Sequence, residues 1–303
     1  MLMARALHER LYFHLGRFTH GFSLLFQSAK LPSRGDSVAI PKPCLQAMIA
    51  PAPHFYSGMV PVWRPGRVWQ DPGGPVMIDI PPGWFTMGEN PGDKFSSEIE
   101  RPAHEVSIAP GLAFSMAPVT VGEFRAFRPG YLPEDDPALP AIYVSWVDAA
   151  EYCAGLSLKT GRPYRLPSES EWEFACRAGS VAKFTYGDEI TPLMANYLYS
   201  ENGRRVGHGR RTPAGAYPPN VFGLHDVHGN VCEWVADVWH PTYEGAPAEG
   251  SAWNGPGELR VLRGGGWDYL PRLLRSSHRD CLPRHCRRDN IGFRLALTLE
   301  VPE

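Results

Sequence analysis

The amino-acid sequence predicts a loop-rich α+β fold, and three of its features support that prediction. Glycine and proline, with 31 residues each, make up about a fifth of the 303 residues. Residues that interrupt helices this often exclude a long helical bundle or coiled coil. Three short helix starts lie among several short strand-like stretches. These elements do not alternate in the βαβ rhythm of a parallel sheet, and 43% hydrophobic residues are enough for a packed core.

Three helix starts share one arrangement, a hydroxyl residue followed three positions later by a carboxylate. They are Thr120 with Glu123, Ser145 with Asp148, and Ser168 with Glu171. In each pair the two side chains can bond to each other's free backbone N–H groups. We expect the second helix to run to residues 159–160 and stop at Gly161, and the third to stop near Gly179. Ser145 and Ser168 are therefore predicted to be helix caps, without a role as nucleophiles.

Strands are predicted where apolar and polar residues alternate. Residues 77–80 form one such stretch, and the turn sequence PPG separates it from a second at residues 84–88. Short strands and long loops are expected beyond residue 180. A final alternating strand is predicted over residues 291–297.

Residues 1–70 differ from the remainder because they show no regular period and are punctuated by prolines. We interpret them as an arm or a small assembly segment, and predict one domain over residues 71–299. Polar residues interrupt the first 30 positions too often for a signal peptide, and no apolar run is long enough to span a bilayer. The six cysteines form neither a CxxC pair nor a zinc quartet. A reduced, cytoplasmic protein is the default expectation, with display at a surface or on a phage as the alternative.

Nine short motifs follow one another in a characteristic order. They are FTMG (85–88), ERPAHEV (100–106), PVTVGEF (118–124), VSWVDAA (144–150), YRLPSESEWEF (164–174), NVFGLHD (220–226), GNVCEW (229–234), RGG (263–265) and GFR (292–294). Together they resemble the formylglycine-generating enzyme (sulfatase-modifying factor) family over roughly residues 75–297. That resemblance implies a C-type-lectin-like fold, which agrees with the high content of glycine and proline.

The resemblance also implies where catalytic chemistry would lie. In catalytic members, two cysteines spaced C-x4-C follow the Gly-Gly motif, hold copper and oxidise a substrate cysteine with oxygen. Soft thiolates suit copper(I). Counted from that motif, the two positions fall on Tyr269 and Leu274, which cannot provide thiolates. Cys281 and Cys286 form a second C-x4-C pair twelve residues later and are the alternative copper ligands.

Residues 263–294 resemble the C-terminal variable regions of proteins targeted by diversity-generating retroelements. Framework residues alternate there with chemically unrelated side chains that follow neither a helical nor a strand period. The resemblance implies that AAY codons are randomised at their adenines, which cannot produce Lys, Glu, Gln or Met. None of these four residue types occurs in the segment. The candidate ligand-binding residues are Asp268, Tyr269, Leu270, Leu273, His278, Asp280, Cys281, Leu282, His285, Cys286 and Asp289.

Such a segment would work as a binding face if its exchangeable side chains were exposed on a rigid scaffold. Framework arginines are expected to pair with carboxylates and carbonyls. We expect Tyr269, Leu270 and Leu273 to form an apolar centre, surrounded by polar side chains such as His278, Asp280 and His285. Burial in the core is the alternative interpretation for Leu274 and Cys286.

Nucleic acid is a rival ligand, because residues 260–294 contain nine arginines and three aspartates. Several of these arginines occupy framework positions of the family, which favours structural pairing. The formal net charge of the whole chain is −2, so a general affinity for polyanions is not expected.

The stretch DVHGNVCE (226–233) resembles a calcium loop of the family. The resemblance implies carboxylate ligands from Asp226 and Glu233 and carbonyl ligands from Gly229 and Val231, the hard oxygens that calcium prefers. A turn capped by its own carboxylates is the alternative. His225, His228 and His240 lie in or near this stretch without the helical i,i+4 spacing of a metal-binding pair. We interpret them as surface histidines.

Taken together, these features favour a non-catalytic protein that binds a protein or another macromolecule, with calcium as a scaffold ion. The alternative from the enzyme class is an oxidoreductase of the family that acts on a cysteine or a small molecule and loads copper at Cys281 and Cys286.

Overall fold

A computed structural model describes residues 66–299, and the statements below concern this range. The predicted arm at residues 1–70 lies outside it, apart from its last five residues. Three of those residues form β1 (Val68–Gln70), which pairs with β2. No helix in the described range is long and apolar enough to cross a bilayer.

The strands form three small sheets. The first sheet has the strand order β1-β2-β5-β11-β6. Besides β1 it contains β2 (Val76–Asp79), β5 (Leu112–Ser115), β11 (Ala296–Thr298) and β6 (Tyr164–Arg165). The second has the order β10-β7-β8-β9, with β10 (Ile291–Phe293), β7 (Cys232–Val238), β8 (Leu259–Arg263) and β9 (Asp280–Pro283). The third pairs β3 (Gly83–Met87) with β4 (His104–Ile108). All pairings are antiparallel except that of β10 with β7, which is parallel.

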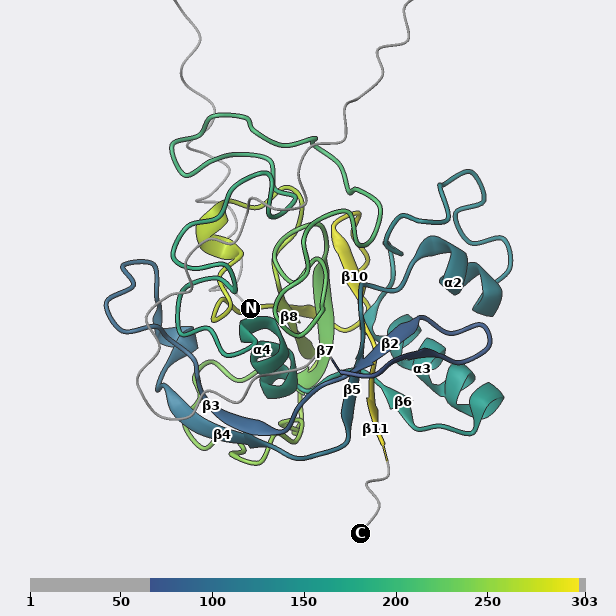
Figure 1. Cartoon of the computed structure of the whole chain (residues 1–303), viewed down its shortest axis with the longest axis horizontal. Coiled ribbons are helices and arrows are strands. Elements are labelled where there is room, and N and C mark those ends of the chain that lie inside the picture. Colours follow the sequence, from purple (N-terminus) through teal and green to yellow (C-terminus); the bar gives the residue numbers. More distant parts are fainter. Residues whose placement is uncertain (1–65, 300–303) are drawn as a thin grey trace, which may run out of the picture. The chain divides into compact units, whose positions relative to one another are not determined.

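The three predicted helices are present with their predicted caps. They are α2 (Val121–Phe127), α3 (Trp146–Thr160) and α4 (Glu169–Arg177), and each begins with a complete capping box. Gly161 ends α3 in the left-handed conformation at φ 72°, as expected. The last turn of α4 closes at Ala178, one residue before the predicted stop. In Figure 1, α2 and α3 lie on one side of the central strands and α4 on the other. Two short 3-10 helices, η1 (Glu98–Glu100) and η2 (Pro271–Leu273), complete the elements.

The predicted final strand over residues 291–297 is wrong as a single element. It is divided into β10 and β11, which belong to different sheets. The division falls at Arg294, whose buried guanidinium group forms an ion pair with Glu233 on β7. Residues 294–295 belong to neither strand and connect the two sheets.

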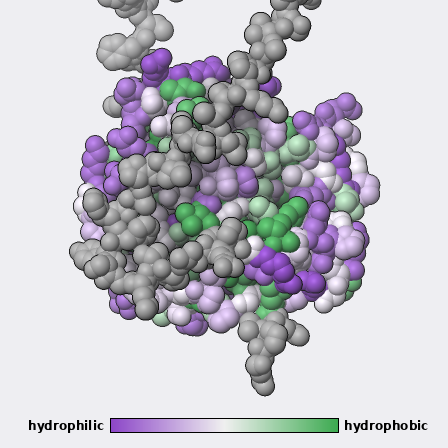
Figure 2. Space-filling model, viewed as in Figure 1, coloured by the Kyte–Doolittle hydropathy of each residue, from purple (hydrophilic) through white to green (hydrophobic). Residues whose placement is uncertain are grey.

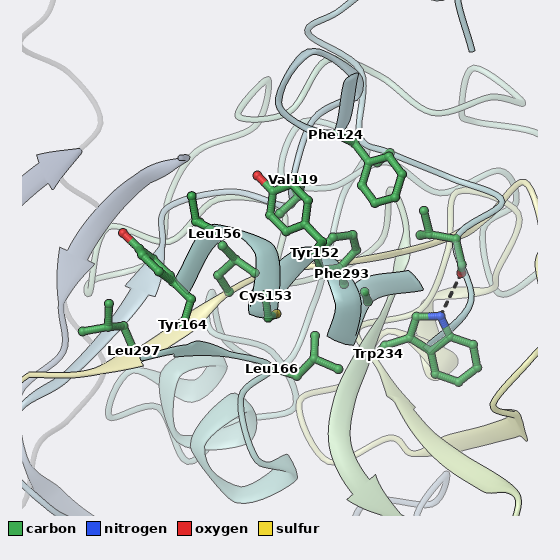
Figure 3. Packing of buried hydrophobic residues seen from close by; sticks show 14 of the residues in the cluster. Val119, Phe124, Tyr152, Cys153, Leu156, Tyr164, Leu166, Trp234, Phe293 and Leu297 are labelled. Atoms are coloured by element: carbon green, nitrogen blue, oxygen red, sulfur yellow. Dashed lines mark hydrogen bonds between the residues drawn. The ribbon is translucent and has the colours of Figure 1, made fainter. Parts of the chain in front are cut away.

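Two hydrophobic clusters hold these elements together. The first packs α2 and α3 against β7, β10 and β11, and its aromatic rings include Phe124 stacked on Tyr152 at 5.6 Å. Figure 3 shows this cluster and the indole N–H of Trp234, which donates to the Val144 carbonyl at 3.0 Å. The second packs α4 against β3, β4 and β8. On the face of the molecule in Figure 2, apolar side chains form small separate patches among hydrophilic ones.

Candidate ligand-binding site

The candidate binding segment, residues 263–294, starts and ends beside the same strand. Arg263 at the end of β8 is paired with Glu233 of β7, and Ile291 at the start of β10 is paired with its neighbour Cys232. Between these points the chain forms η2, β9 and the connecting loops. Gly265 begins the first loop at φ 72°, where an added β-carbon would lie 2.8 Å from the Leu273 carbonyl oxygen. The tight turn therefore requires glycine at this position.

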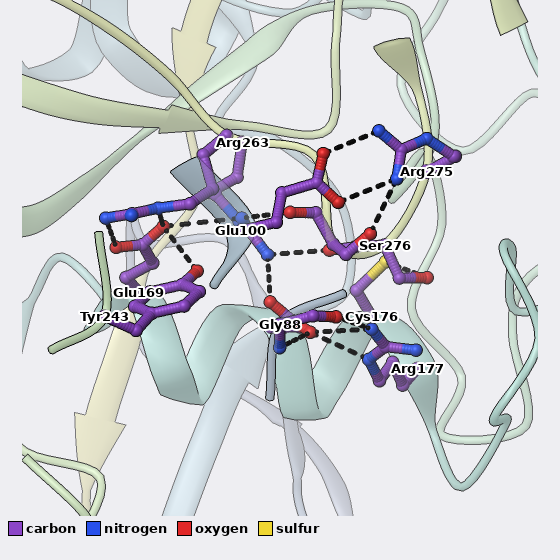
Figure 4. Close-up of polar contacts among 12 residues, drawn as sticks. Gly88, Glu100, Glu169, Cys176, Arg177, Tyr243, Arg263, Arg275 and Ser276 are labelled. Carbon is purple, nitrogen blue, oxygen red and sulfur yellow. Dashed lines mark hydrogen bonds and ion pairs between the residues drawn. The ribbon is translucent and has the colours of Figure 1, made fainter. Parts of the chain in front are cut away.

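Four arginines of the segment are fully buried (Arg263, Arg275, Arg279 and Arg294), and each is paired with at least one glutamate from elsewhere in the chain. Arg263 contacts Glu173 and Glu169 on α4. The guanidinium group also donates to the backbone carbonyls of Ser276 and Ser277, at 2.6 and 3.2 Å. Figure 4 shows this network, which ties the end of β8 to the loop after η2. The expected pairing of framework arginines is thus present.

Arg275 and Arg279 each bind one glutamate through two nitrogens. Arg275 donates to both oxygens of Glu100 at 2.7 and 2.8 Å. Arg279 donates to both oxygens of Glu169 at 2.6 and 2.8 Å, and its guanidinium group stacks 4.1 Å from the centre of the Tyr243 ring. Bidentate pairs of this kind set the orientation of both partners.

The pKa of Glu169 reflects its ion pairs with the two arginines. Burial alone raises the pKa of a carboxyl group, but the charges of Arg279 and Arg263 outweigh this effect and keep the pKa of Glu169 below its ordinary value. Sequence reasoning missed Glu100, Glu169 and Glu173 as partners of the segment. They occur in the family motifs ERPAHEV and YRLPSESEWEF, which were the available signal.

None of the eleven candidate ligand-binding residues is buried. Asp268, His285 and Asp289 are exposed. The other eight are partly exposed: Tyr269, Leu270, Leu273, His278, Asp280, Cys281, Leu282 and Cys286. The interleaved framework residues Leu274, Arg275, Ser276, Ser277 and Arg279 are all buried. Buried and accessible positions therefore alternate along the segment, without the period of a helix or a strand.

Some candidate residues also contact the scaffold. Tyr269 and Leu282 pack against the first hydrophobic cluster, and the Tyr269 hydroxyl donates to Asp280 at 3.0 Å. Asp268 accepts two hydrogen bonds from the Asn290 amide. The expected apolar centre is therefore only partly free, because Tyr269 also covers the core.

The alternative interpretation, burial, is confirmed for Leu274 and wrong for Cys286. Leu274 is completely buried and clusters with Phe184, Ala195 and Tyr197. Cys286 stays partly exposed.

The alternative copper pair has limited support from its surroundings. Cys281 and Cys286 are both free thiols. Burial, together with the charge of Asp280, raises the pKa of Cys281 to about 11, which disfavours the thiolate that copper requires. Within residues 66–299, His, Cys, Asp and Glu side chains do not gather in groups of three that could hold a metal ion. Copper binding at this pair stays a prediction.

The two predicted carboxylate ligands of calcium have different surroundings. Both oxygens of Glu233 accept hydrogen bonds from Arg294, at 2.6 and 2.7 Å, and one also accepts from the Trp172 indole. Asp226 accepts one hydrogen bond from the Gly215 N–H at 2.7 Å, and burial raises its pKa to about 6. Glu233 would have to leave a buried ion pair before it could bind calcium, whereas Asp226 has one buried oxygen without a hydrogen-bond partner. Calcium binding therefore stays a prediction.

The surface assignment of His228 is wrong, because its side chain is buried. Its Nδ1 lies 2.7 Å from the Leu274 carbonyl, which can only accept, and its Nε2 accepts from the Thr185 N–H at 3.0 Å. These partners require a neutral ring that carries its proton on Nδ1. His225 and His240 are partly exposed.

We expect His228 to stay neutral through the mildly acidic range. Burial lowers its pKa from 6.5 to about 4, so the unfolded chain binds this proton more readily than the folded one. The contribution of His228 to stability is complete above pH 6.5 and is lost as the pH falls towards 4. Its imidazole chemical shift, followed by NMR, should not titrate between pH 7 and 5. A midpoint near 6.5 would contradict the buried hydrogen bonds.

Comparison with known proteins assigns the chain to a protein family. The Sulfatase-modifying factor enzyme 1-like domain matches residues 67–299. The formylglycine-generating enzyme of Thermomonospora curvata is 34% identical, over 73% of this chain and 92% of its own length. The inactive C-alpha-formylglycine-generating enzyme 2 of Mus musculus is 28% identical, over 76% and 88%. The serine/threonine-protein kinase Pkn1 of Chlamydia trachomatis is 30% identical over 73% of this chain, which spans only 38% of that kinase.

Solved structures of similar proteins support the same family and fold. PvdO from Pseudomonas aeruginosa has a TM-score of 0.70 and 37% identity, covering 78% of this chain and all of PvdO. Treponema denticola variable protein 1 has a TM-score of 0.64 over 79% of this chain and all of that protein; at 21% identity it shows a shared fold alone. The chain therefore belongs to the sulfatase-modifying factor (formylglycine-generating enzyme) family and has its C-type-lectin-like fold.

Proposed function

We propose that this protein is a non-catalytic binding protein whose ligand contacts the eleven candidate residues of the segment 263–294, and that these positions are diversified between copies. The observation that carries the proposal is the alternation along this segment. Buried arginines hold the backbone through carboxylates of the scaffold, while all eleven candidate residues are exposed or partly exposed.

This arrangement separates folding from recognition. Exchanging an accessible side chain usually changes stability by no more than about 0.5 kcal/mol, whereas each buried arginine is held independently of its accessible neighbours. The surface can therefore vary while the loop keeps its shape. A protein called variable protein 1 has this same fold, which is compatible with the proposal at the level of the fold.

A protein surface is a better match for the ligand than a nucleic acid. Seven of the nine arginines in residues 260–294 are in ion pairs, and four of them are buried. Few guanidinium groups are thus free for phosphates. The accessible residues combine leucine, tyrosine, histidine and aspartate, a mixture suited to protein surfaces.

The enzyme alternative lacks a comparable observation. Tyr269 and Leu274 occupy the positions of the copper-binding cysteines, and Leu274 is buried. Copper bound in a one-to-one ratio and lost after Cys281→Ser would favour the oxidoreductase over the binder.

A display library tests the proposal directly. We expect the full chain, with its eleven candidate codons randomised, to remain folded and to yield binders to hen egg-white lysozyme with dissociation constants in about the micromolar to nanomolar range. The control library randomises exposed positions elsewhere, such as Leu158, Val181 and Val221, and should yield none. If the first library misfolds or performs no better than the control, the proposal fails.

Diversification itself is tested at the locus. Sequencing of many cells from one population should find adenine-linked substitutions confined to codons 268–290. An invariant segment, with no template copy of the coding sequence nearby, would contradict diversification.

A further inference from the structure

We infer that Tyr143, which lies outside the segment 263–294, is a constant contact of the protein ligand and serves every combination of diversified side chains. The inference rests on the proposed function and extends the binding face beyond its variable positions. Three observations carry it: the position of Tyr143, its exposure and its backbone conformation.

Tyr143 lies directly beside the binding segment. Its backbone N–H donates to the Arg288 carbonyl at 2.8 Å, and three residues later the Trp146 N–H donates to the Arg284 carbonyl at 3.0 Å. Residues 143–146 therefore run alongside residues 284–288. That stretch of the segment contains the candidate residues His285 and Cys286.

The side chain of Tyr143 faces solvent although its neighbours do not. Tyr143 is 49% exposed, whereas Ile142 and Val144 are buried. The backbone around it is held firmly, since the Ala141 N–H donates to the Val119 carbonyl and the Trp234 indole donates to the Val144 carbonyl. A rigid, half-exposed tyrosine offers a large contact area with little loss of conformational entropy on binding.

The backbone of Tyr143 is strained. Its φ of 54° lies in the left-handed region, which costs a residue with a β-carbon about 1–2 kcal/mol. Glycine or asparagine would adopt this conformation more easily, and a half-exposed ring recovers little of the cost through packing. Strain that folding does not require is typical of positions kept for binding.

Replacement of Tyr143 by asparagine should separate stability from binding. Because asparagine tolerates the left-handed conformation, we expect the thermal midpoint of Tyr143→Asn to stay unchanged or rise by about 2–4 °C. The same substitution in lysozyme binders from the library should weaken binding about tenfold or more, whichever diversified side chains they carry. Tyr143→Phe, which keeps the ring, should retain most of the affinity.

Trp84 on β3 provides a matched control. It is 72% exposed, and its sheet is not the one that contains the strands of the binding segment. Trp84→Asn should leave lysozyme binding unchanged. If the binders keep their affinity after Tyr143→Asn, the inference is wrong while the proposed function stands. A fall of the midpoint by more than about 4 °C would indicate a structural role and also overturn it. If the library that keeps Tyr143 yields no lysozyme binders, both proposals fail.

Discussion

Replacement of Glu169 by alanine is expected to lower the free energy of unfolding by about 3–5 kcal/mol, because it leaves the buried Arg279 without its carboxylate and removes one of the two carboxylates beside the buried Arg263. Glu169 binds Arg279 through both oxygens and contacts Arg263 and the Tyr243 hydroxyl. For a domain of this size the thermal midpoint should fall by roughly 6–20 °C. Chemical denaturation of the variant and of the unsubstituted chain, at the same pH and salt concentration, measures the difference.

The matched control is Glu151→Ala. Glu151 also pairs with an arginine, Arg128, but its side chain is 58% exposed, so removing it should cost less than about 1 kcal/mol. Equal effects of the two substitutions would mean that the buried pairs do not hold the binding segment. A loss for Glu169→Ala that is partly recovered in Glu169→Gln would separate the charge from the shape of the side chain.

The second large effect is expected at one of two adjacent leucines. Leu274→Ala should cost about 2–5 kcal/mol, since it opens a cavity at a fully buried site, whereas Leu273→Ala should cost less than about 1 kcal/mol. Leu274 contacts the tight turns at Gly229 and Gly265. Leu273, a candidate ligand-binding residue, is partly exposed. Urea unfolding of the two single variants gives both values.

This comparison bears directly on the binding face. A large loss for Leu274 with a small one for Leu273 is the pattern required if neighbouring residues serve different purposes. Similar losses at both sites would mean that Leu273 belongs to the core, and the set of exchangeable positions would then be smaller than proposed.

Local chemistry was sufficient to predict the helices. Each capping box involves residues three positions apart, and the stop at Gly161 depends on the conformational freedom of a single residue. The exposure of the candidate residues in the segment 263–294 was also predictable from local features, because side chains of unrelated chemistry alternate there with framework residues. These signals are short-range, so the sequence contains them directly.

The contacts that hold the segment were beyond such reasoning. Arg275 is 175 residues from Glu100 in the chain, and Arg279 is 110 residues from Glu169. Nothing in the local pattern selects one glutamate over another. The same applies to Glu233, for which Arg294 competes with a predicted calcium ion. It applies also to His228, whose partners Thr185 and Leu274 come from two separate loops.

The attachment of the segment 263–294 to one strand has a consequence for its transfer between proteins. Its two ends lie beside neighbouring residues of β7, Glu233 and Cys232, so the distance that the segment must close does not depend on its length. Lengthening a loop between fixed ends costs little, about 0.6 kcal/mol for each doubling. A segment of different length or origin could therefore be grafted as a single cassette onto this scaffold, provided that it keeps the arginines that meet Glu100, Glu169 and Glu173.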